Sequence, residues 1–223
     1  MAKLFSAIVL SLFLCGIGFA DEAIKDGVKK EYYPNGKLKS EAKYKNGKEN
    51  GFKREYAEDG LLLTEIIYED GVWRDHKDYF EGGKIVHHST NSKDGIFHGT
   101  NYYANGQMMQ DYEDHNNRNI FMREYYPSGK LAAEILYNKN GKETETAYDE
   151  QGNVIKDGLR VEYHPVTMMP IGQTPYKDGK RNGVAVISLS GGEDKSKLEQ
   201  VFKDGKVVEE RNYNKDGHLI KKP

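Results

Sequence analysis

The sequence predicts an all-β fold, an elongated antiparallel meander of tandem β-hairpin repeats of about 23 residues each. Three observations predict it. A glycine recurs at a fixed period, a tyrosine precedes each of these glycines by four residues, and the segments between the turns alternate in polarity. Beyond the first twenty residues no segment has a convincing helical stripe; the nearest candidate, residues 193–202, is short.

The repeat is defined by three columns of residues. Its glycines stand 24, 23, 23, 23 and 23 residues apart, at Gly36, Gly60, Gly83, Gly106, Gly129 and Gly152. The preceding tyrosines, here called the tyrosine column, are Tyr32, Tyr56, Tyr79, Tyr102, Tyr125 and Tyr148. Two residues after each glycine comes an apolar side chain: Leu38, Leu62, Ile85, Met108, Leu131 and Val154. Six coincidences at constant offsets indicate a structural repeat.

The residues around the first glycine predict the type of turn. Pro34 suits a φ of about −65°, and Gly36 supplies a positive φ. Together they predict a three-residue hairpin loop, in which a type I turn is followed by a bulge glycine. The pairing that continues from such a loop places Tyr32 opposite Leu38. The tyrosine and apolar columns should therefore be cross-strand neighbours on one face.

The strand after this loop alternates strictly. Leu38, Ser40, Ala42 and Tyr44 share one predicted face, and lysines and Glu41 share the other. A second turn, usually Asn-Gly or Asp-Gly, then returns the chain to the next unit. The glycines that close these turns are Gly47, Gly71, Gly95 and Gly141. Two turns in each unit leave strands of ordinary length.

The first twenty residues have a different pattern. Lys3 precedes an apolar run over residues 4–17, and Gly18 and Ala20 place small residues before a cut. This pattern is typical of a signal peptide cleaved after Ala20, so a secreted or periplasmic protein is expected. One alternative is an uncleaved anchor, although the run is short of the about 20 residues that span a bilayer. Another is a lipoprotein acylated at Cys15, which lacks small residues before it.

The chain divides into three predicted parts. Residues 1–20 are the signal peptide, and residues 21–157 hold six regular repeats. The period slips after Gly152, so residues 158–223 are interpreted as degenerate terminal repeats with an inserted loop over residues 188–197. Cleavage would remove the single cysteine, so no disulfide is expected in the mature chain.

The composition bears on the partner. Charged residues make up 30% of the chain, but bases and acids are interleaved and the formal net charge is only −2. Nucleic acid is therefore not an expected partner, because phosphate binding requires a clustered basic face. The membrane is expected to be contacted only through the signal segment.

The first unit resembles the MORN-repeat variant found in many bacterial proteins. The residues that carry the resemblance are Gly27, the run Tyr32-Tyr33-Pro34-Asn35-Gly36-Lys37-Leu38, Glu41, the run Tyr44-Lys45-Asn46-Gly47-Lys48, and Gly51. Similar motifs cover most of residues 26–152 and parts of 158–217. The resemblance implies a sheet of stacked hairpins that acts by binding. That family includes chains labelled as antitoxins of toxin–antitoxin pairs, the YwqK type, so an antitoxin-like or immunity-like binder is one implied role.

Residues suited to catalysis or metal binding form no recognisable set. His87 and His88 are adjacent and should point to opposite faces of a strand, and the other histidines have no ligand spacing. No nucleophile elbow, phosphate-binding loop or Cys-His arrangement is present in the sequence. We therefore expect no enzyme activity, no catalytic residues, no metal and no cofactor.

The tyrosine column has two interpretations. Its rings are either the core of the array, stacked from unit to unit, or a partly open aromatic surface that binds a partner. The second interpretation makes the six tyrosines the candidate binding face. The expected function is then a protein–protein interaction or scaffolding module at the cell envelope. The alternative is an aromatic array that binds glycans or the cell wall.

Overall fold

The protein consists of two antiparallel β-sheets, one of 11 strands and one of 7. The computed structural model describes residues 25–141, 143–190 and 193–220, and every regular element among them is a strand. None of these residues belongs to a helix long and apolar enough to cross a membrane. The predicted all-β meander is confirmed.

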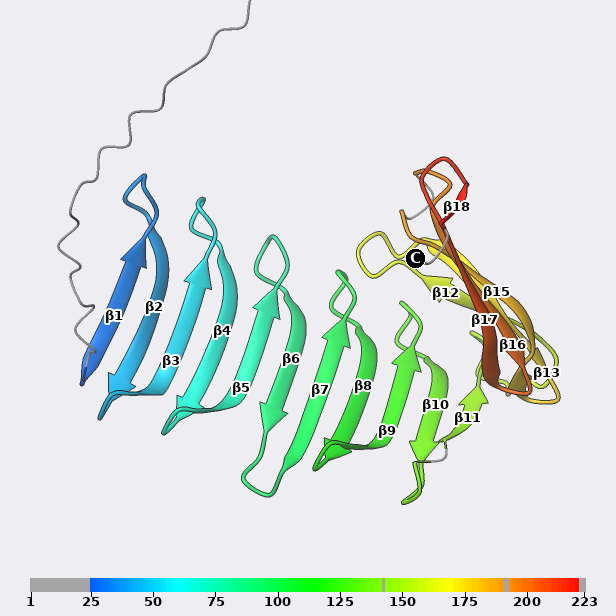
Figure 1. Cartoon of the computed structure of the whole chain (residues 1–223), viewed down its shortest axis with the longest axis horizontal. Coiled ribbons are helices and arrows are strands. Elements are labelled where there is room, and N and C mark those ends of the chain that lie inside the picture. The colour runs from blue at the N-terminus through cyan, green and yellow to red at the C-terminus, as the bar shows by residue number, and fades with distance from the viewer. Residues whose placement is uncertain (1–24, 142, 191–192, 221–223) are drawn as a thin grey trace, which may run out of the picture.

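The first sheet follows the order of the chain from β1 to β11, so each strand pairs with its sequence neighbours. Its strands are β1 (Gly27–Tyr32), β2 (Leu38–Lys45), β3 (Lys48–Tyr56), β4 (Leu62–Glu69), β5 (Val72–Tyr79), β6 (Ile85–Asn91), β7 (Ile96–Tyr102), β8 (Met108–His115), β9 (Arg118–Tyr125), β10 (Leu131–Tyr137) and β11 (Glu143–Ala147). Figure 1 shows them as a row of hairpins from blue to green.

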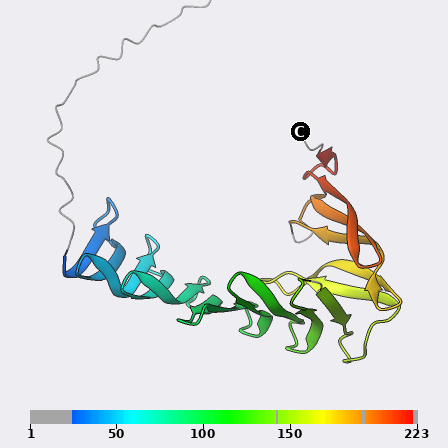
Figure 2. The same cartoon turned by 60° about the horizontal axis from the view of Figure 1, so that its bottom comes forward.

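The second sheet rises steeply from the β11 end of the first (Figure 2). Its strands are β12 (Gly158–Tyr163), β13 (Pro170–Lys177), β14 (Lys180–Arg181), β15 (Gly183–Ser188), β16 (Lys197–Lys203), β17 (Lys206–Tyr213) and β18 (Leu219–Ile220). The order again follows the chain, except that the short β14 pairs with β13 beside the main path. Residues 193–202 are thus not helical, because most of them belong to β16.

The loop between β1 and β2 has the predicted geometry. Gly36 donates its N–H to the carbonyl of Tyr33 at 2.9 Å, and Tyr33 donates to the carbonyl of Lys37 at 2.8 Å. The φ of Gly36 is 81°, which only glycine adopts without strain. The same pair of bonds closes the corresponding loop in the next five units. The predicted cross-strand pair, Tyr32 with Leu38, is also formed and recurs in all six units.

A second irregularity follows this pair and was not predicted. Glu31 pairs with Ser40, so Lys39 is an extra residue in β2. The same one-residue shift follows the tyrosine–aliphatic pair in the next four hairpins. Because side chains alternate along a strand, one extra residue moves everything beyond it to the opposite face.

The prediction that the tyrosine column shares a face with Ser40, Ala42 and Tyr44 is therefore wrong. The hydroxyl of Tyr56 donates a hydrogen bond of 3.0 Å to Glu41. Glu41 lies between Ser40 and Ala42 in the strand, so its side chain points to the other face. The tyrosines accordingly lie with the charged side chains and not with the small and apolar ones.

The return turns are tight. In the turn after β2, Asn46 and Gly47 have φ values of 52° and 76°, which define a type I′ turn. Gly47 also donates its N–H to the carbonyl of Lys25 at 2.7 Å, and Gly71 donates to the carbonyl of Glu49 at 2.8 Å. The turn that ends each of these two hairpins is therefore hydrogen-bonded to the backbone at the start of the same hairpin.

The buried core is small and lies where the two sheets meet. Ala147, Ile155 and Tyr176 form its one cluster, at 1%, 8% and 4% exposed respectively, among the described residues. The rest of the first sheet is a single layer whose larger side chains are mostly half-buried. The predicted signal segment, residues 1–20 with Cys15, lies outside the described residues.

Candidate functional site

The tyrosine column shares its face with a row of charged side chains. Arg54 lies two residues before Tyr56, so the two point the same way. The guanidinium of Arg54 is 2.7 Å from Glu65 and 3.7 Å from Glu41, the residues opposite it on the two neighbouring strands. Burial raises the pKa of Tyr56, and its hydrogen bond to Glu41 adds to the rise.

This row continues across the sheet, one residue from each strand, because each member is the cross-strand partner of the next. We call it the charge row. In order from β1 to β11 its members are Lys30, Glu41, Arg54, Glu65, Lys77, His88, Thr100, Asp111, Arg123, Glu134 and Thr146. The face that carries the charge row and the tyrosine column is here called the tyrosine face.

Charges alternate along most of the charge row. Lys30 lies 3.6 Å from Glu41, and Arg123 bonds Glu134 at 2.9 Å. The hydrogen bond to Glu134 raises the pKa of Arg123. Opposite charges directly across a ladder stabilise the pairing, although exposed pairs contribute only about 0.2–1 kcal/mol each. The charge row therefore contributes little to stability, and its main effect is a pattern of alternating charge on the surface.

The same face repeats a larger motif. In β3 the guanidinium of Arg54 lies 4.6 Å from the ring centroid of Phe52, and in β9 that of Arg123 lies 4.8 Å from the ring of Phe121. In each strand a tyrosine of the column follows the arginine by two residues. Phenylalanine, arginine and tyrosine thus stand in line on two strands of the open face.

The six column tyrosines are not the core. Tyr32 is 58% exposed, and the other five are intermediate in exposure. Among the described residues, no ring–ring contact joins two members of the column. The stacked-core interpretation therefore does not describe these rings, which lie over the charge row. Whether they bind a partner stays a prediction.

Two of the buried tyrosines follow the column by one residue. Tyr103 and Tyr126 are 4% and 3% exposed. The hydroxyl of Tyr103 donates to the carbonyl of Tyr125 at 2.8 Å, and that of Tyr126 donates to the carbonyl of Tyr148 at 2.6 Å. These are the neighbouring units, so the second tyrosine of each pair fastens one hairpin to the next. In the sequence, a second tyrosine directly after the column tyrosine was the signal that could have predicted these bonds between hairpins.

The second sheet packs on the face opposite the tyrosine face. Arg160 of β12 bonds Glu124 of β9 at 2.6 Å, and Arg181 of β14 bonds Glu145 of β11 at 2.8 Å. Glu124 follows Arg123 directly, so its side chain lies on the other face from the charge row. The two ion pairs therefore leave the tyrosine face uncovered.

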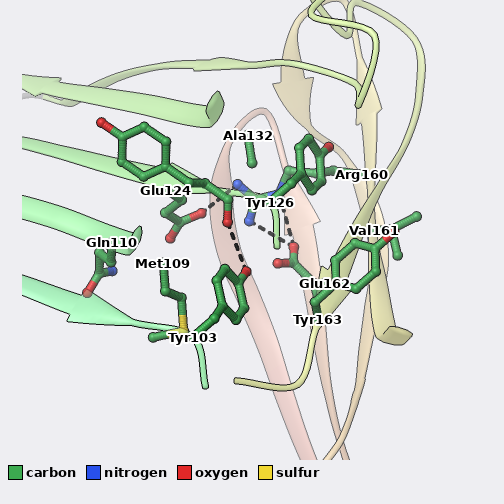
Figure 3. Close-up of a pocket in the computed structure, with 11 residues that line it drawn as sticks. Tyr103, Met109, Gln110, Glu124, Tyr126, Ala132, Arg160, Val161, Glu162 and Tyr163 are labelled. Carbon is green, nitrogen blue, oxygen red and sulfur yellow. Dashed lines mark hydrogen bonds and ion pairs between the residues drawn. The ribbon is translucent and has the colours of Figure 1, made fainter. Parts of the chain in front are cut away.

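A pocket of about 160 Å³ lies at this junction, and we call it the junction pocket. Figure 3 shows Arg160 between Glu124 and Glu162 in its wall. Tyr126 and Tyr163 meet there edge to face, with ring centroids 6.0 Å apart at 87°. Burial raises the pKa of Tyr126 to about 12. A hydrogen bond to Glu150, together with burial, raises the pKa of Tyr163 to about 12.

Four histidines, His76, His87, His88 and His98, each bond one polar side chain. His88 lies 2.8 Å from Asp75, whereas the adjacent His87 bonds Asn101 at 2.8 Å on the opposite face. In the described part of the chain, no three His, Cys, Asp or Glu side chains are grouped so that they could hold a metal ion.

Comparison with known proteins bears on the repeat. Residues 25–46 and 122–139 match the family described as MORN repeat variant. The first stretch covers the hairpin of β1 and β2, and the second covers part of β9, the loop that follows it and all of β10. No curated protein shows a significant sequence match to the chain. The chain is thus a β-hairpin repeat protein similar to this variant at two stretches, and such repeats are often binding or interaction modules.

Proposed function

We propose that the protein is a non-catalytic recognition module, exported to the cell envelope, that binds a protein partner through the tyrosine face. The observation that carries the proposal is the uncovered face itself, on which partly exposed tyrosines lie over alternating charges. Tyrosine and arginine are enriched at protein interfaces. The pattern of the first twenty residues supports export.

The size of the face suits a protein. Strands lie about 4.8 Å apart and rise about 3.3 Å per residue, so eleven strands of six residues cover about 1,000 Å². A standard interface takes about 800 Å² from each partner. The face is therefore large enough for a stable complex without the second sheet.

The charges suit a protein better than a polyanion. The charge row holds four bases, Lys30, Arg54, Lys77 and Arg123, and four acids, Glu41, Glu65, Asp111 and Glu134. Since these cancel, the row offers no net attraction to nucleic acid or to an anionic surface. A partner whose own charges alternate would pair opposite charges with the charge row in only some alignments. Such a pattern favours specificity over affinity.

Site-directed photo-crosslinking tests the proposal. We expect a crosslinking side chain at Tyr56 or Tyr125 to capture a discrete partner in intact envelopes. A matched probe at Tyr68 should capture none. Tyr68 lies in β4, next to β3, but its side chain is on the face opposite the tyrosine face, with Lys53. Equal capture from both faces, or capture only from Tyr68, would contradict the proposal. Retention on cell-wall polysaccharide that is lost in Y56A would instead favour the glycan alternative.

A further inference from the structure

The junction pocket has features of a ligand site that is separate from the tyrosine face. We infer that it binds one neutral, polyhydroxylated six-membered ring, that is, one pyranose unit of a sugar or glycan. The size of the pocket, its charge, its free hydrogen-bonding groups and its aromatic wall support this class of ligand.

The volume of the pocket sets the size of the ligand. At about 160 Å³ it is close to the roughly 150 Å³ cavity that holds one benzene ring in a protein interior, so the ring of a pyranose can enter while its outer hydroxyls stay at the rim. A drug-sized ligand requires at least about 300 Å³. One ring is therefore the largest rigid unit that can enter, with any remainder of the ligand in solvent.

The charges exclude simple ions. Glu124 and Glu162 lie 2.6 and 2.8 Å from the guanidinium of Arg160, which is 5% exposed. Two carboxylates against one guanidinium leave one negative charge, so an anion is repelled. A cation is disfavoured as well, because Arg160 already occupies the position between the carboxylates. A neutral ligand remains.

The polar groups keep capacity to bond a ligand that both donates and accepts. Among the described residues, Oε1 of Glu124 and Oε2 of Glu162 accept no hydrogen bond, while the other oxygen of each is taken by Arg160. Arg160 uses three of its five N–H groups in these bonds. Acceptors and donors thus stand side by side, and a sugar hydroxyl is both at once.

An aromatic wall completes the site. The ring of Tyr163 is half-buried and packs edge to face on Tyr126, at 87°. Tyr126 is 3% exposed, so it supports the ring of Tyr163 and offers no open face of its own. The apolar C–H face of a pyranose packs against the ring of Tyr163 while its hydroxyls reach the carboxylates. Because Tyr126 is held by its hydroxyl bond of 2.6 Å to the carbonyl of Tyr148, the wall is supported before binding and little side-chain entropy is lost.

The pocket joins two parts of the fold. Glu124 belongs to the first sheet, whereas Arg160, Glu162 and Tyr163 belong to β12 of the second. A ligand bonded to both sheets stabilises the junction, so binding should also raise the midpoint of thermal unfolding.

Titration calorimetry of the purified protein tests the inference. The probes are glucose, galactose, mannose and N-acetylglucosamine, each as the monosaccharide and as a linear oligosaccharide. A ligand of about twelve heavy atoms at ordinary efficiency should bind with a Kd on the order of 1 mM. Tighter binding of the oligosaccharide would identify a glycan as the source, and equal binding would identify the free sugar.

Three variants locate the site. Y163L should weaken binding about tenfold or more, because a ring wall is lost. Y163F should bind within about twofold of the unchanged protein, since it keeps the ring and loses only the bond to Glu150. Y32L, on the tyrosine face, should also bind normally. If Y163L unfolds, sugar-to-tyrosine proton contacts measured by NMR in the unchanged protein provide the second readout.

Three results would overturn the inference: no sugar bound at up to about 10 mM, binding of phosphate or methylammonium in place of sugar, or sugar contacts mapped to the tyrosine face. None of these depends on whether the tyrosine face captures a protein, so failure here is distinct from failure of the proposed function.

Discussion

The hydroxyl of Tyr33 donates a hydrogen bond of 2.7 Å to the backbone carbonyl of Tyr56, one repeat further along the chain. The same bond recurs from Tyr103 to Tyr125 and from Tyr126 to Tyr148. In a repeat array each unit contacts only its neighbours, so such bonds add to the interface energy between units. The second and third units carry Ala57 and Phe80 at this position and have no hydroxyl to donate.

Removing one of these hydroxyls should weaken the array. Y103F leaves the carbonyl of Tyr125 without its donor in a buried setting, and should lower the free energy of unfolding by about 1 kcal/mol. Urea denaturation measures the change. Y32F is the matched control and should lie within about 0.5 kcal/mol of the unchanged protein, because Tyr32 is exposed.

Adding the missing hydroxyl should have the opposite effect. Phe80 occupies the loop position of Tyr103, with the same two loop hydrogen bonds to Gly83 and Lys84. F80Y should therefore donate to the carbonyl of Tyr102 and raise the free energy of unfolding by about 0.5–1.5 kcal/mol. The urea midpoint reports the gain. A midpoint at or below that of the unchanged protein would show that the ring is placed differently.

Gly99 is required by a neighbouring ring. A Cβ built on Gly99 would lie 2.3 Å from Cζ of Tyr112, whose ring centroid is 5.7 Å from that of Phe97. G99A should displace Tyr112 and cost about 1–3 kcal/mol in thermal or urea unfolding. The double variant G99A/Y112L relieves the clash, so it should be no less stable than Y112L alone. A fully stable G99A would contradict this account.

Arg160 should be indispensable to the junction. R160M leaves Glu124 and Glu162 without their cation in a largely buried site and should destabilise the protein by about 3–5 kcal/mol. The triple variant R160M/E124Q/E162Q removes the stranded charges and should recover part of the loss. Urea unfolding of both proteins measures the difference. Equal loss in the two would show that packing of the arginine, and not its charge, matters.

Stability should fall in alkali. Burial raises the pKa of Tyr126 from 10.0 to about 12 in the folded protein, and burial also raises the pKa of Tyr103 and Tyr176. Unfolded phenols release protons from about pH 10, whereas the folded phenol of Tyr126 holds its proton to about pH 12. Its contribution is therefore complete below pH 10 and lost as the pH rises towards 12.

Unfolding free energies measured between pH 8 and pH 12 test this. Y126F removes one such phenol, so its stability should fall less steeply above pH 10. Y32F, at an exposed position, should follow the unchanged protein. A flat profile up to pH 12 would contradict the account.

The charge row was present in the sequence as a pattern at fixed offsets. Four repeat glycines have a base six residues before them: Lys30, Arg54, Lys77 and Arg123. Four repeat glycines have an acid five residues after them: Glu41, Glu65, Asp111 and Glu134. A search for charge at the repeat period would have found both columns. It would not have shown that these charges share a face with the tyrosine column, because the extra residue at the bulge decides which side chains share that face.

The sequence alone determined the repeat, the loop type and the pairing of Tyr32 with Leu38, because φ preferences and strand alternation act within a few residues. Tertiary structure decided which face the tyrosines occupy, since a second bulge shifts the alternation by one. It also decided which face is covered and that Arg160 is buried between two carboxylates. The last two outcomes depend on contacts between residues far apart in the chain, such as Arg160 and Glu124, which no local pattern encodes.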